Sequence, residues 1–228
     1  MGSAERRQRE REELRSRIVD AARDILSTEG LDALSIRSIA ERIEYSPATI
    51  YLYFRDKDEL IREVARAGAT RLAAYIEEKV AELGLDANPA DRFRATGRAY
   101  ARFAVEHTAY FRVMFELPKV PRMNGLPAMD VDPLPPCDAD LVTLVRQAKE
   151  AGLINVADPV QAALAGWGAM HGLASLYLSG RLSPAVQGPE HLAALIDAAL
   201  ATLWEGWKGQ EARDPEQARR GGTAAASV

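Results

Sequence analysis

Apolar residues recur every three or four positions over most of the chain, which is the spacing of amphipathic helices rather than of strands. The first such stretch continues to Glu29, and the following Gly30 suits the left-handed position just after a helix. Its apolar stripe consists of Leu14, Ile18, Ala21, Ile25 and Leu26. The pattern predicts one helix with a single buried face.

Capping residues predict two short helices next. Ser35 is placed to cap the first of them, and Ser46 followed by Pro47 has the order of an N-cap and a first helical residue. The inward-facing residues of this pair are Ile36, Ile39, Ala40, Ile43, Ile50 and Phe54. Asp56 with Glu59 then forms a capping box for a fourth helix, which is expected to end near residue 84.

The same signals continue to the C-terminal end. Further helices are predicted to begin at Asn88-Pro89, Thr108, Asp138, Asp158-Pro159 and Pro189, the last of them ending near Trp207. Six prolines between residues 118 and 137 exclude a regular helix there. No segment alternates as a strand does, so we expect an all-α fold of about nine helices.

These predicted helix boundaries divide the chain into the following segments: a flexible basic arm (1–12), a helix-turn-helix domain (13–60), a connecting helix (61–84), a ligand-binding and dimerisation domain (85–208) and a disordered tail (209–228).

Charge and composition narrow the functional classes. The net charge is −4, but residues 1–71 hold 14 basic and 14 acidic residues, so a DNA-binding half must gather its cations on one face. Residues 1–17 lack the apolar region of a secretory signal, and the single cysteine, Cys137, excludes an intramolecular disulfide, so we expect a cytoplasmic protein. The apolar stretch 160–178 is interrupted by polar residues and predicts a buried helix rather than a membrane span.

Catalysis is not expected. His107, His171 and His191 are scattered, and the chain has neither a metal-ligand spacing nor a glycine-rich phosphate loop nor a nucleophile elbow. The sequence therefore predicts no enzyme, no metal and no cofactor.

The strongest functional pattern lies in residues 34–60. Two short helices joined by Glu44-Tyr45-Ser46 predict a helix-turn-helix, although such corners also occur in proteins that bind no DNA. The whole stretch resembles the TetR family signature, and residues 21–30 resemble the family's first helix. The matching residues are Ser35, Ile39, Ala40, Ser46, Thr49, Tyr51, Phe54, Lys57 and Leu60.

Chemistry and this resemblance together suggest DNA-binding roles. Ser46, with the free N–H groups of the first turn after it, is expected to bind phosphate, and Thr49 is the expected base reader because it offers a hydroxyl and a methyl group. The expected phosphate contacts are Arg37, Tyr51, Tyr53 and Lys57, and Ser35 is also counted in the DNA-binding surface. The alternatives are that the tyrosines pack and that Arg37 and Lys57 are only solvated.

Three residues depart from the family pattern. Pro47, Ala48 and Leu52 replace glycine or basic residues that are common there, so the base preference is left open, although Pro47 and Ala48 are still counted in the DNA-binding surface. The arm Arg6–Arg11 resembles extensions that enter the minor groove, and the alternative of a solvated tail is favoured over that role.

The resemblance implies that residues 85–208 bind a small molecule and dimerise. Residues 166–173 resemble the Trp…His-Gly element of one TetR subgroup, and Trp167 and His171 share a helix face. An apolar ligand pocket is expected around Phe93, Tyr100, Phe103, Phe111, Met114, Phe115, Trp167 and His171. The alternative is ordinary core, with His171 hydrogen-bonded to a neighbour, and it is favoured for Trp167 and His171.

The Ala- and Gly-rich helices from Pro159 and Pro189 suit close packing, and family members pair these last two helices between subunits. The predicted protein is a homodimeric repressor that leaves a palindromic operator when a small apolar ligand binds. The competing hypothesis is a helical protein-interaction module without sequence-specific DNA binding.

Overall fold

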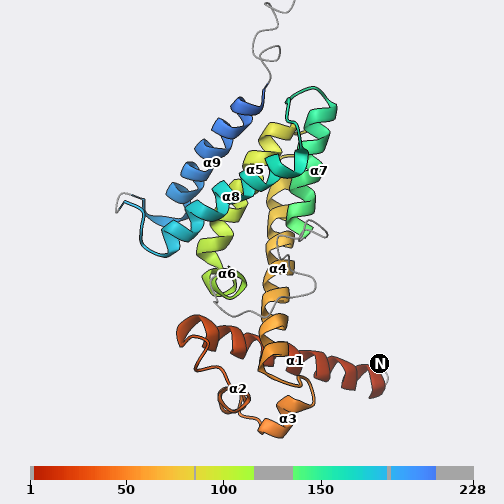
Figure 1. Cartoon of the computed structure of the whole chain (residues 1–228). Coiled ribbons are helices and arrows are strands. Elements are labelled where there is room, and N and C mark those ends of the chain that lie inside the picture. The colour runs from red at the N-terminus through yellow and green to blue at the C-terminus, as the bar shows by residue number, and fades with distance from the viewer. Residues whose placement is uncertain (1–2, 85, 116–135, 184–185, 209–228) are drawn as a thin grey trace, which may run out of the picture. The chain divides into compact units, whose positions relative to one another are not determined.

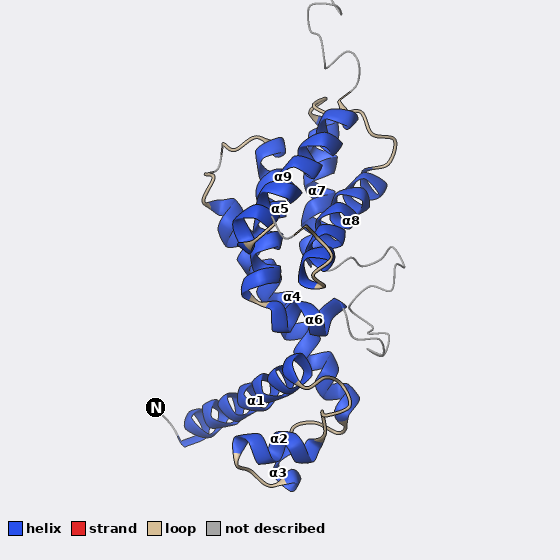
Figure 2. Cartoon of the chain, turned by 90° about the vertical axis from the view of Figure 1, so that its left-hand side faces the viewer, coloured by secondary structure: helices blue, strands red, loops and turns tan. Residues whose placement is uncertain are grey.

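The structure is a computed structural model that describes residues 3–84, 86–115, 136–183 and 186–208. In these ranges it contains nine helices and no strand (Figures 1 and 2), which confirms the expected all-α fold. No helix among them combines the length and the hydropathy of a membrane span.

The chain forms two compact units. The first contains residues 1–72 and 107–135, and the second contains residues 73–106 and 136–228. The predicted boundaries differ, because helix α6 (Thr108–Phe115) packs against α1 in the first unit rather than with residues 85–208. The predicted connecting helix is also divided, since the boundary falls within α4 (Lys57–Ala81).

The first unit is built on α1 (Ser3–Thr28), α2 (Ile36–Ile43), α3 (Pro47–Tyr51), the start of α4 and α6. Its core contains the predicted stripe of the first helix together with the inward residues of α2 and α3. The core residues with no exposed surface are Ile18, Ala22, Ile39, Ile50, Leu60, Val64 and Ala65.

The caps predicted for α2 and α3 are confirmed, whereas only half of the capping box predicted for α4 forms. The Ser35 hydroxyl accepts from the backbone N–H of Ser38 at 2.9 Å, and the Ser46 hydroxyl accepts from that of Thr49 at 3.2 Å. Asp56 accepts from the N–H of Glu59 at 2.7 Å, but the Glu59 carboxylate returns to Arg55 rather than to Asp56. Each cap satisfies an N–H group that lacks a partner within its helix.

The expected flexible arm is helical from Ser3 onward. Its charges lie at helical spacing, with Arg6 paired to Glu10 at 3.6 Å and Gln8 donating to Glu12 at 2.6 Å. Such contacts four residues apart stabilise a helix even where no apolar face is buried.

The second unit contains the end of α4 together with α5 (Pro89–Glu106), α7 (Pro136–Glu150), α8 (Pro159–Leu178) and α9 (Gly188–Trp207). Its most extensive contact joins α5 and α9, and α8 packs on α5, α7 and α9. Gly97 allows α5 and α9 to approach closely, because a Cβ atom at this position would clash with the Leu200 side chain. Asn88 and Asp158 cap α5 and α8 as predicted.

Three helix starts differ slightly from prediction. Helix α6 includes Thr108, its predicted cap, and α9 begins at Gly188, one residue before Pro189. Helix α7 begins at Pro136 rather than Asp138, because proline is tolerated in a first turn. The rest of the predicted proline-rich loop, and the predicted disordered tail, lie outside the described residues.

Candidate nucleic-acid interface and effector cleft

Helices α2 and α3 meet at a tight turn with an unusual backbone. Glu44 adopts a left-handed conformation (φ 62°), which a non-glycine residue rarely takes, and the N–H of Tyr45 donates to the carbonyl of Ala40 at 2.9 Å. Ile43, at the end of α2, and Ile50, in α3, are both buried in the core of this unit. The turn and this shared core together set the angle between the two helices.

Helix α3 holds four of the nine predicted DNA-binding residues: Pro47, Ala48, Thr49 and Tyr51. Pro47 and Ala48 are exposed, and Tyr51 is 58% exposed. Thr49 is half-buried, and its hydroxyl lies 2.9 Å from that of Ser46, so the expected base reader also takes part in the cap. Tyr53 is half-buried and packs against the core, which agrees with the packing alternative for that residue.

The other predicted contacts already have partners within the unit. Ser35 is used in its cap, and the exposed Arg37 pairs with Glu41 at 2.9 Å. The Lys57 ammonium donates to the carbonyl of Leu31. Arg37 and Lys57 would therefore have to exchange or share these partners to reach a phosphate.

Sequence reasoning missed the contribution of α1 to this surface. Arg11 lies over the ring of Tyr53 at 5.9 Å, and Arg17 lies over the ring of Tyr45 at 5.5 Å and donates to the carbonyl of Ile43. Tyr45 is 40% exposed beside the start of α3. Only the tertiary contact reveals these pairs, because their members lie at least 26 positions apart in the sequence.

Many arginines of the first unit form ion pairs with acidic residues. The ion pairs include Arg15–Glu63, Arg23–Asp20, Arg23–Asp24, Arg42–Glu29, Arg55–Glu59 and Arg66–Glu63. This agrees with the balanced charge of residues 1–71. The candidate interface therefore relies on geometry and on a few cations more than on a strong positive field.

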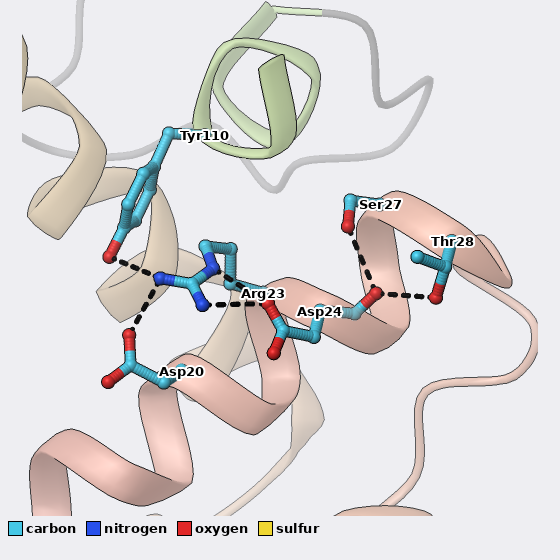
Figure 3. A network of polar contacts seen from close by, with 6 residues as sticks. All are labelled: Asp20, Arg23, Asp24, Ser27, Thr28 and Tyr110. Carbon is cyan, nitrogen blue, oxygen red and sulfur yellow. Dashed lines mark hydrogen bonds and ion pairs between the residues drawn. The ribbon is translucent and has the colours of Figure 1, made fainter. Parts of the chain in front are cut away.

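Arg23 of α1 links α1 to α6 (Figure 3). Its guanidinium bonds Asp20 at 2.8 Å and Asp24 at 2.7 Å, and it donates to the Tyr110 hydroxyl at 3.2 Å. A Cβ atom on Gly68 would lie 2.7 Å from the Met114 sulfur, so α4 also approaches α6 closely. These contacts explain why α6 belongs to the first unit.

Glu63 holds α1 to α4. Partial burial alone would raise the pKa of its carboxyl, but hydrogen bonds from Arg66 and Arg15 outweigh burial and lower that pKa to about 2. A lowered carboxyl pKa adds stability that is fully present above the unfolded value of about 4.5 and is lost as the pH falls toward about 2.

Glu63→Gln should lower the free energy of unfolding at pH 7 by roughly 1–2 kcal/mol, because it removes charged hydrogen bonds to two arginines. Urea unfolding at pH 7, 4.5 and 3 measures this. The difference between variant and wild type should shrink below pH 4.5. The exposed Glu41→Gln serves as the control, and an equal difference at all three pH values would contradict the role of the Glu63 charge.

The second unit contains a cavity of about 470 Å³ between α4, α5 and α7. Its residues are Ile76, Glu77, Val80, Ala81, Gly84, Arg92, Thr96, Leu141, Thr143, Leu144 and Gln147. Ile76, Leu141 and Leu144 are buried and provide an apolar floor. Arg92 and Glu77 bring charges of both signs to the lining of this cleft. Among the residues described, neither the Arg92 guanidinium nor the Glu77 carboxylate has an ion-pair partner.

None of the eight residues predicted to bind ligand lines this cleft. Phe93, Tyr100 and Phe103 are fully buried core of the second unit. Phe111, Met114 and Phe115 belong to the first unit, where Phe111 and Phe115 pack ring against ring at 4.9 Å. Sequence spacing identified apolar positions but did not distinguish a core from a cavity wall.

The contacts of Trp167 and His171 agree with the alternative in which both residues belong to the core. Their rings stack at 5.0 Å, and the His171 Nδ1 atom lies 2.9 Å from the Tyr100 hydroxyl. Burial lowers the pKa of His171, which favours the neutral ring. The predicted hydrogen bond to a neighbour is confirmed, and a ligand-binding role for these residues stays a prediction.

Taken together, the fold and the exposed α3 define a helix-turn-helix protein of the all-helical regulator class. The family model described as "Bacterial regulatory proteins, tetR family" matches residues 18–64, and the model "Tetracyclin repressor-like, C-terminal domain" matches residues 93–203. The two matches span more than half of the 228 residues, and the chain belongs to the TetR family. Membership of a family of regulatory proteins agrees with the expectation that the chain is not an enzyme; the Trp…His-Gly subgroup stays a prediction.

Individual relatives agree with this assignment. The HTH-type transcriptional regulator UidR of Escherichia coli K12 is 33% identical over 73 residues, which cover 32% of this chain and 37% of UidR. The chain thus matches only about a third to a half of the length of its curated relatives.

Solved structures match almost the whole fold. A Rhodococcus sp. RHA1 protein of unknown function has a TM-score of 0.69 and 29% identity, covering 86% of this chain and 96% of that one. A TetR family transcription regulator from Marinobacter aquaeolei VT8 has a TM-score of 0.65 and 22% identity, covering 87% and 97%.

Proposed function

We propose that this protein is a homodimeric repressor that binds a palindromic operator through α3 and is released by a small molecule. The main support for DNA binding is that α3 is buried on one side and exposed on the other. Ile50 and the following Phe54 are buried, whereas Pro47, Ala48 and Tyr51 face solvent. A short helix anchored on one side and exposed on the other suits insertion into the major groove.

The last two helices support dimerisation. The outward face of α8 carries Ala165, Gly168 and Gly172, and a Cβ atom at either glycine would meet no other atom within 4 Å. Exposed Leu176 on α8 and Leu195 on α9 add apolar surface. Two such pairs can pack as a four-helix bundle, and the two-fold axis then presents two copies of α3 about 34–36 Å apart.

The cleft between α4, α5 and α7 is the proposed effector site. Its apolar floor and unpaired charges suit an amphipathic molecule with an apolar body and charged or polar groups, rather than the purely apolar ligand expected from the sequence. Helix α4 lines the cleft with Ile76 and Val80 and begins, at Lys57, in the DNA-binding unit. A ligand that moves α4 would alter operator affinity, and DNA would weaken the ligand by the same factor.

Selection from a random duplex library at moderate salt tests this function. Enrichment of an inverted repeat with half-sites about one helical turn apart would support a dimeric operator-binding protein. Absence of any enriched sequence would favour the protein-interaction module. Thr49→Ala should change the base preference of the selected site if α3 reads bases.

The effector site has its own test. Thr143→Trp should fill the cleft and abolish the response to any compound that a screen finds to release the wild-type protein from the selected operator. Operator affinity without the compound should stay within two-fold of wild type, as measured by fluorescence anisotropy. Arg146→Trp, which lies on the same helix outside the cleft, is the matched control. If Thr143→Trp still responds normally to the compound, the effector must bind outside this cleft.

A further inference from the structure

The centre of the outward face of α3 is apolar. Successive residues of a helix are rotated by 100°, so Ala48 and Leu52 lie about 160° and 200° around the axis from the buried Ile50. Leu52 closes the helix in a right-handed helical conformation (φ −71°, ψ −16°), so its direction continues that of the helix. The residues that point most directly away from the core are therefore Ala48 and Leu52, one turn apart.

Leu52 has no packing role in its own unit. Its side chain is 74% exposed, more than any other large apolar residue exposed in the described ranges, and it is not part of the core cluster. Thr49 and Tyr51 lie on either side of this face. The apolar patch is therefore continuous with the proposed DNA-binding surface.

We propose that Leu52, supported by the methyl group of Ala48, reads the C5-methyl group of a thymine in each half-site. Neither side chain can donate or accept a hydrogen bond. In the major groove the thymine methyl is the base feature that an apolar side chain can recognise. A leucine here would disfavour the other three bases at its position, which makes Leu52 a specificity-determining residue.

This inference rests on the proposed function, and its test separates the two. In the selected operator, each thymine is replaced singly by deoxyuridine, which lacks only the methyl group, and affinity is measured by fluorescence anisotropy. With the wild-type protein we expect a roughly three- to five-fold loss at one thymine per half-site, the value of one buried methyl group. With Leu52→Ala the same replacement should have no effect.

Two further variants complete the experiment. Thr49→Ser keeps the hydroxyl but removes a methyl group, and it should leave the deoxyuridine effect at the Leu52 position unchanged. Leu52→Arg should select guanine at that position, because arginine pairs with the guanine edge. Unchanged melting temperatures would show that all three exposed or half-exposed substitutions fold.

The outcomes are distinct. If the deoxyuridine effect persists in Leu52→Ala, or occurs at no position, the thymine contact by Leu52 is refuted while operator binding stands. If no duplex is selected at all, both the proposed function and this inference are refuted.

Discussion

Replacing Phe93 by alanine is expected to lower the free energy of unfolding by about 3–5 kcal/mol. The ring has no exposed surface and packs against Trp204 at 5.5 Å and Trp207 at 5.3 Å between ring centres. A Cβ atom on Gly166 of α8 would lie 2.8 Å from this ring. The ring thus fills the space where α5, α8 and α9 meet, and its loss leaves a cavity that none of them can close alone.

Thermal and urea unfolding would measure this loss, with a fall in melting temperature of roughly 6–20 °C. Leu153→Ala is the control, because that side chain is 42% exposed and should cost well under 1 kcal/mol. A small loss of stability for Phe93→Ala, accompanied by weaker effector binding, would instead support the ligand-lining role predicted from the sequence.

Gly172→Leu should convert the protein to a monomer and reduce operator affinity by about 100- to 10,000-fold. The new side chain projects into open space within one chain, so the subunit should still fold, but it would occupy the space into which α8 of a second copy packs. A monomer binds one half-site and loses the gain in affinity that comes from linking two binding sites.

Analytical ultracentrifugation and anisotropy on the selected operator would test this together. Arg146→Leu, an exposed position on α7, adds similar apolar surface outside the proposed interface and should leave both the mass and the affinity unchanged. A Gly172→Leu protein that remains dimeric with full affinity would contradict pairing through α8. A wild-type protein that is already monomeric would contradict the dimer itself.

The DNA-binding motif could be predicted almost completely because its signals are local. Ser46 caps α3 through the N–H group three residues later, and Pro47 follows in the first turn, so the helix start is encoded within four residues. The same holds for Ser35 on α2. The inward positions Ile39 and Ile50 follow from helical periodicity, since an apolar residue at that spacing must face a core.

The proposed effector site could not be predicted in this way. Phe93 and Ile76 are both apolar residues on helix faces, yet one fills the core and the other lines a cleft. The difference depends on how far apart the neighbouring helices stand, and that distance is set by residues remote in sequence, such as Gly97 against Leu200.

By itself, the sequence determined the helices, their caps and the family, because each depends on residues a few positions apart. The tertiary structure alone decided the placement of α6 with the DNA-binding unit, the pairing of Glu63 with Arg15 and the position of the cleft. These features depend on which helix faces meet. Which faces meet depends on the packing of side chains over the whole unit, and the periodicity of one segment cannot predict it.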